Sequence, residues 1–193
     1  MEPAQAVTAF ILALIGAVVA GFGARDQLLV AALRDRLGQT MPLLAAGLAT
    51  AAGAACVAAW AGTLVGSTLS KDAATMFVAI AMLVAAVECA LPVRQPAPAE
   101  PTRSLGAIAI VLFARQLTDA ARFLVLAVAA TYAAPEMAAL GGALGGAALV
   151  ALGWSMGAAG LERVPLRTIR HFVAIFLFLV AISTGLSARG IIG

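Results

Sequence analysis

Apolar residues fill long stretches of the chain, and polar residues gather in short segments between them. The apolar stretches approach or exceed the roughly 20 residues that span a bilayer as a helix. They are apolar all round and lack the polar face of a soluble amphipathic helix. We expect membrane-spanning helices over about residues 6–33, 42–66, 73–91, 104–132, 135–160 and 168–186. The pattern predicts an all-α integral membrane protein with six transmembrane helices.

Prolines mark the division of the chain into two parts. Pro42 and Pro135 stand at the starts of two expected spans. Backbone amides in the first turn of a helix have no acceptor within the helix, so proline is well tolerated there. Four of the ten residues at 92–101 are proline, which favours an extended segment. We therefore expect a cytoplasmic linker over 93–103, between a first three-helix unit (1–92) and a second (104–193).

The two units are related by an internal repeat. A shift of 93 residues lays Asp26 on Asp119 and Pro42 on Pro135. A unit of three spans inverts on repetition, because its second copy enters the membrane from the opposite side. Inverted repeats place a shared site near the bilayer midplane. We expect Asp26 and Asp119 to approach each other there, across a pseudo-two-fold axis.

The composition indicates a membrane protein, and it argues against a soluble domain, a nucleic-acid-binding protein and an enzyme. The chain of 193 residues is 63% hydrophobic and 11% charged, whereas soluble domains are near 45–50% apolar and 25% charged. The net charge of +3 comes without a basic stripe interleaved with aromatics, so we expect no nucleic-acid partner. No nucleophile–base pair, His/Cys cluster or phosphate-binding loop is present in the sequence, and we expect no enzymatic activity.

Basic residues are unequally divided between the two sides that the spans define. Loop cations are enriched on the cytoplasmic side of membrane proteins. One side has only Lys71 and Arg189. The other side collects Arg34, Arg36, Arg94, Arg103, Arg163, Arg167 and Arg170. The bias predicts an inner-membrane protein, bacterial in type, with both termini outside the cytoplasm.

The polar residues inside the apolar stretches are the candidate functional residues. On one continuous helix, Arg115, Gln116, Asp119 and Arg122 would share a face. Ion pairs with the two arginines would then neutralise Asp119. Asp26 has no basic residue on its own helix face, so it is the first candidate for a proton-carrying acid. Ionisable groups at membrane depth are costly, which makes both aspartates functional-site candidates.

The order of spans, the repeat length and the small-residue helix after each polar segment resemble the family of human transmembrane protein 165 and its bacterial relatives. Each half of that family carries Glu-x-Gly-Asp-[Lys/Arg]-[Ser/Thr] in its first helix. The aspartates fall on Asp26 and Asp119, while the glutamates fall on Gly23 and Gln116. The resemblance implies two inverted three-helix repeats and the exchange of manganese or calcium for protons.

The resemblance and the polar residues together define a candidate site. Asp26 and Asp119 are the candidate ligands for Mn²⁺ or Ca²⁺ as transported ions, and no resident cofactor is expected. Gln116 and Thr118 would add neutral oxygens. The candidate substrate- and proton-binding residues are Asp26, Asp119, Gln116, Thr118, Arg25, Arg115 and Arg122.

Two alternatives remain beside the exchange of cations. The excess of arginine favours an anionic or zwitterionic solute, held by bidentate guanidinium contacts. A non-transporting protein with a structural Arg–Asp cluster is the other alternative. Glu88, four residues before Pro92, is expected near the membrane interface.

The expected partners are the lipid bilayer, a small ion and protons. Gly142 and Gly146 form a GxxxG pair, which permits close approach of two helices. Packing inside the bundle is the simpler use of this pair, and a homodimer is the alternative.

Overall fold

The computed structural model describes residues 3–93 and 104–191, and the regular structure in these ranges is entirely helical. The linker expected over 93–103 lies outside the described residues from position 94 onward. The helices are α1 (Pro3–Gly21), α2 (Arg25–Leu37), α3 (Met41–Thr68), α4 (Lys71–Ala90), α5 (Leu105–Leu117), α6 (Ala120–Tyr132), α7 (Pro135–Glu162) and α8 (Leu166–Ala188).

Five of the described helices, α1, α3, α4, α7 and α8, are long and apolar enough to cross a membrane. The prediction of an all-α protein with membrane-spanning helices is confirmed at this level. The prediction of single helices over 6–33 and 104–132 is wrong. The first stretch breaks between Gly21 and Arg25, and the second breaks between Leu117 and Ala120. At the first break the surrounding sequence is apolar, and at the second it resembles the polar face of a continuing helix.

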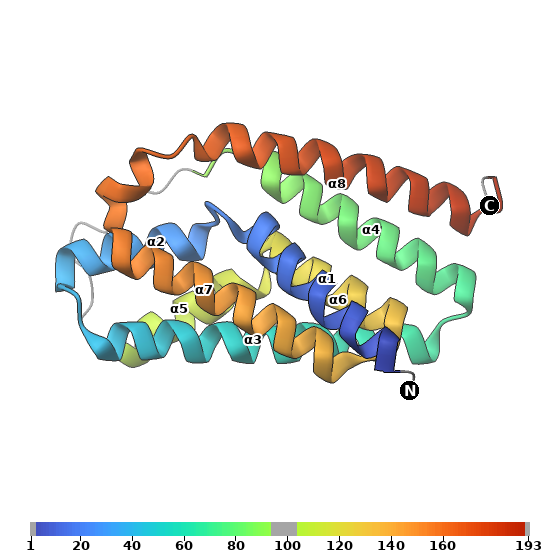
Figure 1. The fold of residues 1–193 in the computed structure, drawn as a ribbon, viewed down its shortest axis with the longest axis horizontal. Helices are drawn as coiled ribbons and strands as arrows, with labels where there is room; N and C mark the ends of the chain where they lie inside the picture. Colours follow the sequence, from blue (N-terminus) through green and yellow to red (C-terminus); the bar gives the residue numbers. More distant parts are fainter. Residues whose placement is uncertain (1–2, 94–103, 192–193) are drawn as a thin grey trace.

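The helices run back and forth along the long axis of the molecule (Figure 1). Both termini lie at one end, together with the α3–α4 and α6–α7 connections. The α2–α3 and α7–α8 connections lie at the other end. Helices α1 and α5 start at opposite ends, and each stops midway, where α2 and α6 continue. Both helix breaks are therefore in the middle of the molecule.

Glycines allow the long helices to approach closely. A Cβ on Gly141 of α7 would collide with the Phe10 carbonyl of α1, and a Cβ on Gly62 of α3 with the Leu126 carbonyl of α6. The GxxxG pair of α7 also faces inward: Gly142 lies against Val125 of α6. This pair is used for packing within the chain, as the simpler interpretation required.

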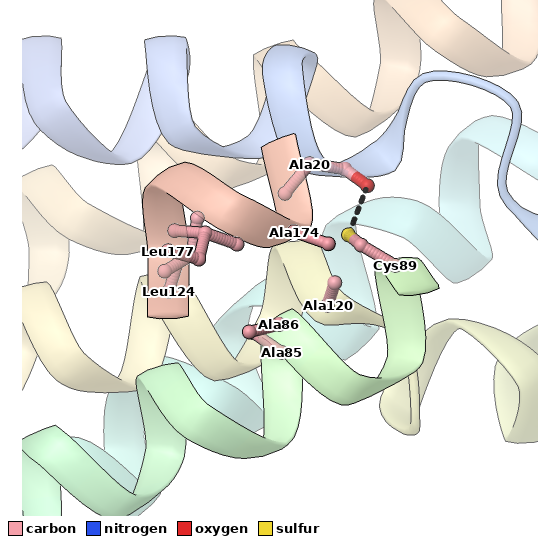
Figure 2. Packing of buried hydrophobic residues seen from close by; sticks show 8 residues of the cluster. All are labelled: Ala20, Ala85, Ala86, Cys89, Ala120, Leu124, Ala174 and Leu177. Atoms are coloured by element: carbon pink, nitrogen blue, oxygen red, sulfur yellow. Dashed lines mark hydrogen bonds between the residues drawn. The ribbon is translucent and has the colours of Figure 1, made fainter. Parts of the chain in front are cut away.

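A cluster of small buried side chains joins α1, α4, α6 and α8 next to the two breaks. Figure 2 shows this cluster, in which the Cys89 thiol donates a weak hydrogen bond to the Ala20 carbonyl at 3.7 Å. Its members are Ala20, Ala85, Ala86, Cys89, Ala120, Leu124, Ala174 and Leu177. Alanine dominates the cluster, so backbones lie close together and the polar groups at the breaks are enclosed on this side.

Helix α7 has an interruption of its own near the α7–α8 end. Gly157 has φ 67°, a conformation that side chains disfavour. The Asp35 carboxylate of α2 accepts a hydrogen bond from the Ala158 amide at 2.8 Å, just after the interruption. The hydrogen bond from Arg34 and that from Ala158 hold the Asp35 pKa below its ordinary value of 3.8. One turn earlier, the Trp154 indole donates to the Thr40 carbonyl at 3.2 Å.

Candidate functional site

The two helix breaks meet in the interior of the molecule. Arg115, in the last turn of α5, donates to the Arg25 carbonyl at the start of α2 over 3.5 Å. A Cβ placed on Gly21, the last residue of α1, would lie 3.6 Å from Asp119 Oδ2. Each break therefore lies against the other, although 93 residues separate Asp26 from Asp119 in the sequence.

The α1–α2 break depends on a glycine and a glutamine. Gly23 has φ 72°, and its amide donates to Gln27 Oε1 at 2.8 Å. Gln27 is completely buried, so this bond satisfies a backbone donor that has no access to water. Asp26 lies in the first turn of α2, where the helix dipole favours a negative charge, and its residue is only 6% exposed. Among the described residues, its carboxylate makes no ion pair.

The α5–α6 break depends on an aspartate. Asp119 is the N-cap of α6, with extended backbone angles, and its Oδ1 accepts from the Ala121 amide at 3.4 Å. Asp119 is as deeply buried as Asp26. Thr118 is exposed, and its hydroxyl donates to carbonyls of the preceding turn. Gln116 is completely buried, and neither atom of its amide has a partner among the described residues.

Arg122 brings a fixed positive charge to the same region. It is 2% exposed, and its Nη2 donates to the Ala51 carbonyl of α3 at 3.2 Å. A Cβ on Gly146 of α7 would come within 2.7 Å of Nη2, so only a glycine leaves room for the guanidinium. Helices α3, α6 and α7 together enclose this cation in the first turn of α6, three residues after Asp119.

The expected pairing of Asp119 with both neighbouring arginines is wrong. Among the described residues, no carboxylate oxygen of Asp119 lies within ion-pair distance of Arg115 or Arg122. The expectation assumed one continuous helix, and the chain leaves the helix at Leu117. Arg115 is thereby turned toward the Arg25 carbonyl. The four residues do not share a helix face.

Glu88 and Arg170 belong to the buried polar region, which sequence reasoning missed. Glu88 of α4 is 7% exposed and Arg170 of α8 is 5% exposed. Arg170 Nη2 donates to the Glu88 carbonyl at 2.8 Å and to Glu88 Oε2 at 3.1 Å. Arg25 reaches Glu88 Oε1 from α2 at 3.5 Å. Glu88 is therefore buried inside the protein, and Arg170 lies in α8 and not in a loop.

One signal for Glu88 was present in the sequence. It is an ionisable residue near the end of an otherwise apolar stretch, which is a functional-site signal by default. Nearby Pro92 suggested a position at the membrane surface. For Arg170 the signal was its position inside the expected span over 168–186, whereas Arg163 and Arg167 precede that span.

A recess approaches the breaks from the α7–α8 end of the molecule. It has a volume of about 450 Å³, and its wall includes Gly23, Cys89 and Arg170. A second recess of about 450 Å³ shares Leu28 and Leu166 with the first. Asp26 and Asp119 do not line either recess. Arg170, which pairs with Glu88, lines the first recess.

Several buried polar atoms of this region have no hydrogen-bond partner among the described residues. They are Gln27 Nε2, both amide atoms of Gln116, and Nε and Nη1 of Arg122 and Arg170. Buried polar atoms are nearly always paired with protein or water. These atoms are free to bind water or a polar ligand.

The described residues contain no group of three or more His, Cys, Asp or Glu side chains placed to hold a metal ion. The site offers the carboxylates of Asp26 and Asp119, while Glu88 is engaged by two arginines. Protein ligands for a divalent ion are therefore few in this arrangement.

No family model, no curated protein and no solved structure matches this chain.

Proposed function

We propose that this protein is a secondary membrane transporter that exchanges a small ion for protons at the two helix breaks. Asp26 and Asp119 are the proposed proton-carrying acids. One observation carries the proposal: two interrupted helices meet in the interior, each with a buried aspartate at its break. Interrupted helices at the midplane are a common way for secondary transporters to form a substrate site.

The proposal includes two inverted repeats, 1–92 and 104–193. Support comes from the order of the helices, since α1 to α4 and α5 to α8 repeat a broken helix followed by two longer ones. The third helix of each set has 28 residues and a proline in its first turn. In this reading α1 with α2, and α5 with α6, each cross the membrane once, giving six crossings.

A buried carboxylate provides the coupling to protons. An isolated ionised carboxylate in a dry interior is very costly, and a bound cation or a proton removes that cost. Asp26 has no ion-pair partner among the described residues, so it depends most on a bound cation or proton. By resemblance to the transmembrane protein 165 family, the transported ion would be manganese or calcium.

The proposed orientation places the α2–α3 and α7–α8 connections in the cytoplasm and both termini outside, in a bacterial inner membrane. The arginines at this end support it: Arg34 and Arg36 in the last turn of α2, Arg163 after α7, and Arg167 at the start of α8. The recess beside Arg170 would then give water access from the cytoplasm as far as Gly23.

Reconstitution tests the proposal. Purified protein in vesicles loaded with a pH indicator is expected to move protons when a cation gradient is applied. Asp26→Asn and Asp119→Asn are expected to reduce this flux to the level of protein-free vesicles. Asp72→Asn, an exposed aspartate in the first turn of α4, is the matched control and is expected to keep the flux.

The outcomes against the proposal are distinct. If the native protein moves no protons with any cation, it is not a proton-coupled cation exchanger. If both site variants keep the native flux, the acids are wrongly assigned.

A second candidate is transport of an anionic or zwitterionic solute. The unpaired buried donors of Gln27, Arg122 and Arg170 favour it, because an anion would accept from them. It predicts flux driven by an anion gradient and a loss of that flux in Arg122→Gln. A structural Arg–Asp cluster without transport predicts no flux under either gradient.

A further inference from the structure

We propose that the recess of about 450 Å³ lined by Gly23, Cys89 and Arg170 binds the phosphate of an anionic phospholipid. Arg167 and Arg170 are the cations that hold the phosphate. We call this recess the headgroup recess. The site goes beyond the proposed function, because it takes a lipid and not the transported ion.

Arg170 is the buried cation of the headgroup recess. It is 5% exposed and lines the recess, and a Cβ on Gly23 would lie 3.5 Å from its Cδ. Its Nη2 donates to Glu88, whereas its Nε and Nη1 have no partner among the described residues. Buried donors are nearly always paired, and phosphate oxygens accept strong hydrogen bonds from a guanidinium. The wall of the recess therefore contains a buried arginine with unused donors.

Arg167 is the accessible cation of the same wall. It is exposed, it lines the headgroup recess, and it makes no ion pair among the described residues. It stands three residues before Arg170 on α8, so the two side chains share a helix face. Pro165, the N-cap of α8, has no side-chain acceptor for the amides of the first turn. These amides and the positive end of the helix dipole also favour an anion here.

The charge around the recess is positive when all the charged groups at the helix breaks and around Glu88 are counted. The acids are Asp26, Glu88 and Asp119, and the cations are Arg25, Arg115, Arg122 and Arg170. The arginines exceed the acids by one, and Arg167 adds a further positive charge. Glu162, which lines the adjoining recess, offsets one of these charges. An excess of positive charge remains, and protonation of any of the acids would only increase it.

Helix α8 places the headgroup recess at the level of lipid headgroups. Its 23 residues give a length of about 35 Å, slightly more than the roughly 30 Å of the hydrocarbon core. The first turn of α8, which contains Arg167, therefore reaches the headgroup layer. Basic pockets between transmembrane helices at this level are suited to anionic lipid headgroups.

The outer face of α8 offers a place for the acyl chains. Among the described helices that could cross a membrane, α8 is the least buried. Phe172 is 70% exposed and Ile175 is 59% exposed. Both line a groove of about 330 Å³ that shares Arg167 and His171 with the headgroup recess. A phosphate bound at Arg167 thus has an apolar groove beside it, which suits a phospholipid better than a free phosphate.

Lipid binding to the delipidated full-length protein in detergent tests the proposal. Phosphatidylglycerol, phosphatidylcholine and inorganic phosphate are added separately. Native mass spectrometry measures the bound lipid, and thermal unfolding measures the stabilisation. We expect phosphatidylglycerol to bind at least about fivefold more tightly than phosphatidylcholine, the effect of one basic residue near an anionic membrane surface. We expect inorganic phosphate to leave the unfolding temperature unchanged.

Variants of the arginines locate the binding. Arg167→Gln is expected to weaken phosphatidylglycerol binding about fivefold and to leave phosphatidylcholine binding unchanged. Arg163→Gln makes the same change in net charge at an exposed arginine outside these recesses, and it should bind as the native protein does. Arg170→Gln should also weaken binding. Because Arg170 is buried against Glu88 and its loss could prevent folding, the exposed Arg167 decides.

Three results would overturn the proposal. Equal affinity for the two lipids would show that the recess does not select a negative headgroup. An equal loss of affinity in Arg163→Gln would show a general effect of surface charge. Stabilisation by inorganic phosphate without lipid retention, lost in Arg167→Gln, would assign the recess to a soluble anion. The proposed proton exchange is measured by flux, so none of these results decides it.

Discussion

A backbone amide is hydrogen-bonded by a side chain at both the α1–α2 and the α5–α6 break, but by different side chains. At the first, Gly23 takes a positive φ and the Gln27 side chain accepts the Gly23 amide, which leaves the Asp26 carboxylate without a structural task. At the second, the Asp119 carboxylate itself caps α6 through the Ala121 amide. A carboxylate engaged by backbone has less freedom to bind an ion. Asp26 and Asp119 occupy equivalent positions under the 93-residue shift, but they have different structural roles.

The two glutamines give the largest expected contrast between the breaks. Gln27→Leu leaves the buried Gly23 amide without its acceptor, which we expect to cost about 1–3 kcal/mol of unfolding free energy. Gln116→Leu removes an amide that has no protein partner among the described residues, so we expect stability to be kept or raised. Denaturant unfolding in detergent micelles measures both.

The Gln116→Leu variant also distinguishes between a structural role of Gln116 and a role as a ligand of the ion. If Gln116 serves the transported ion, Gln116→Leu stays folded and loses ion-driven proton flux. Equal destabilisation by the two glutamine variants would remove the proposed difference between the breaks.

Removal of each aspartate side chain gives the next contrast. Asp119→Ala deletes the cap of α6, and we expect a loss of about 1 kcal/mol in unfolding free energy. Asp26→Ala deletes a buried carboxylate without an ion-pair partner among the described residues, and we expect no loss of stability. Asp119→Ser, which can still cap the helix, should recover part of the loss. A cost for Asp26→Ala equal to that of Asp119→Ala would contradict the comparison.

Asp35 is a second aspartate that accepts from a backbone amide, at the interruption of α7, and its removal gives the smallest expected effect. Its side chain is 34% exposed, and its pKa is lowered mainly by the Arg34 hydrogen bond. Since the folded pKa lies below the unfolded value of 3.8, its stabilisation is complete above that value. It is lost as the pH falls below 3.8 through the folded pKa.

Thermal unfolding measured between pH 6 and pH 2 is expected to show this small loss in the native protein. The Asp35→Asn variant should lack this part of the pH dependence. An unchanged profile in the variant would mean that the Asp35 charge contributes nothing.

The sequence predicted the helical class and the approximate ends of most helices, because apolar length and first-turn prolines such as Pro42 and Pro135 are local signals. The α1–α2 break was missed because the residues around Gly23 continue an apolar run. The α5–α6 break was missed because the residues around Asp119 resemble the polar face of a continuous helix. The cap at Asp119 depends on extended backbone angles that an isolated sequence does not reveal.

The candidate site was predicted in part. Asp26, Gln116, Asp119 and Arg122 are all buried near the breaks, as the repeat and the polar run suggested. The Glu88–Arg170 pair was not predicted, because its partners lie 82 residues apart and nothing in the sequence shows that α4 and α8 pack against each other. Thr118 turned out to be exposed, a consequence of the helix ending one residue before it.

The bond between the Trp154 indole and the Thr40 carbonyl gives the protein an intrinsic optical reporter. The chain has two tryptophans, and the other, Trp60, is 64% exposed on α3. Replacing Trp60 with phenylalanine would leave Trp154 as the single fluorophore. Its emission would then report contact between α7 and the α2–α3 connection. A movement of α7 that breaks this contact with the α2–α3 connection would change the fluorescence, without an added label.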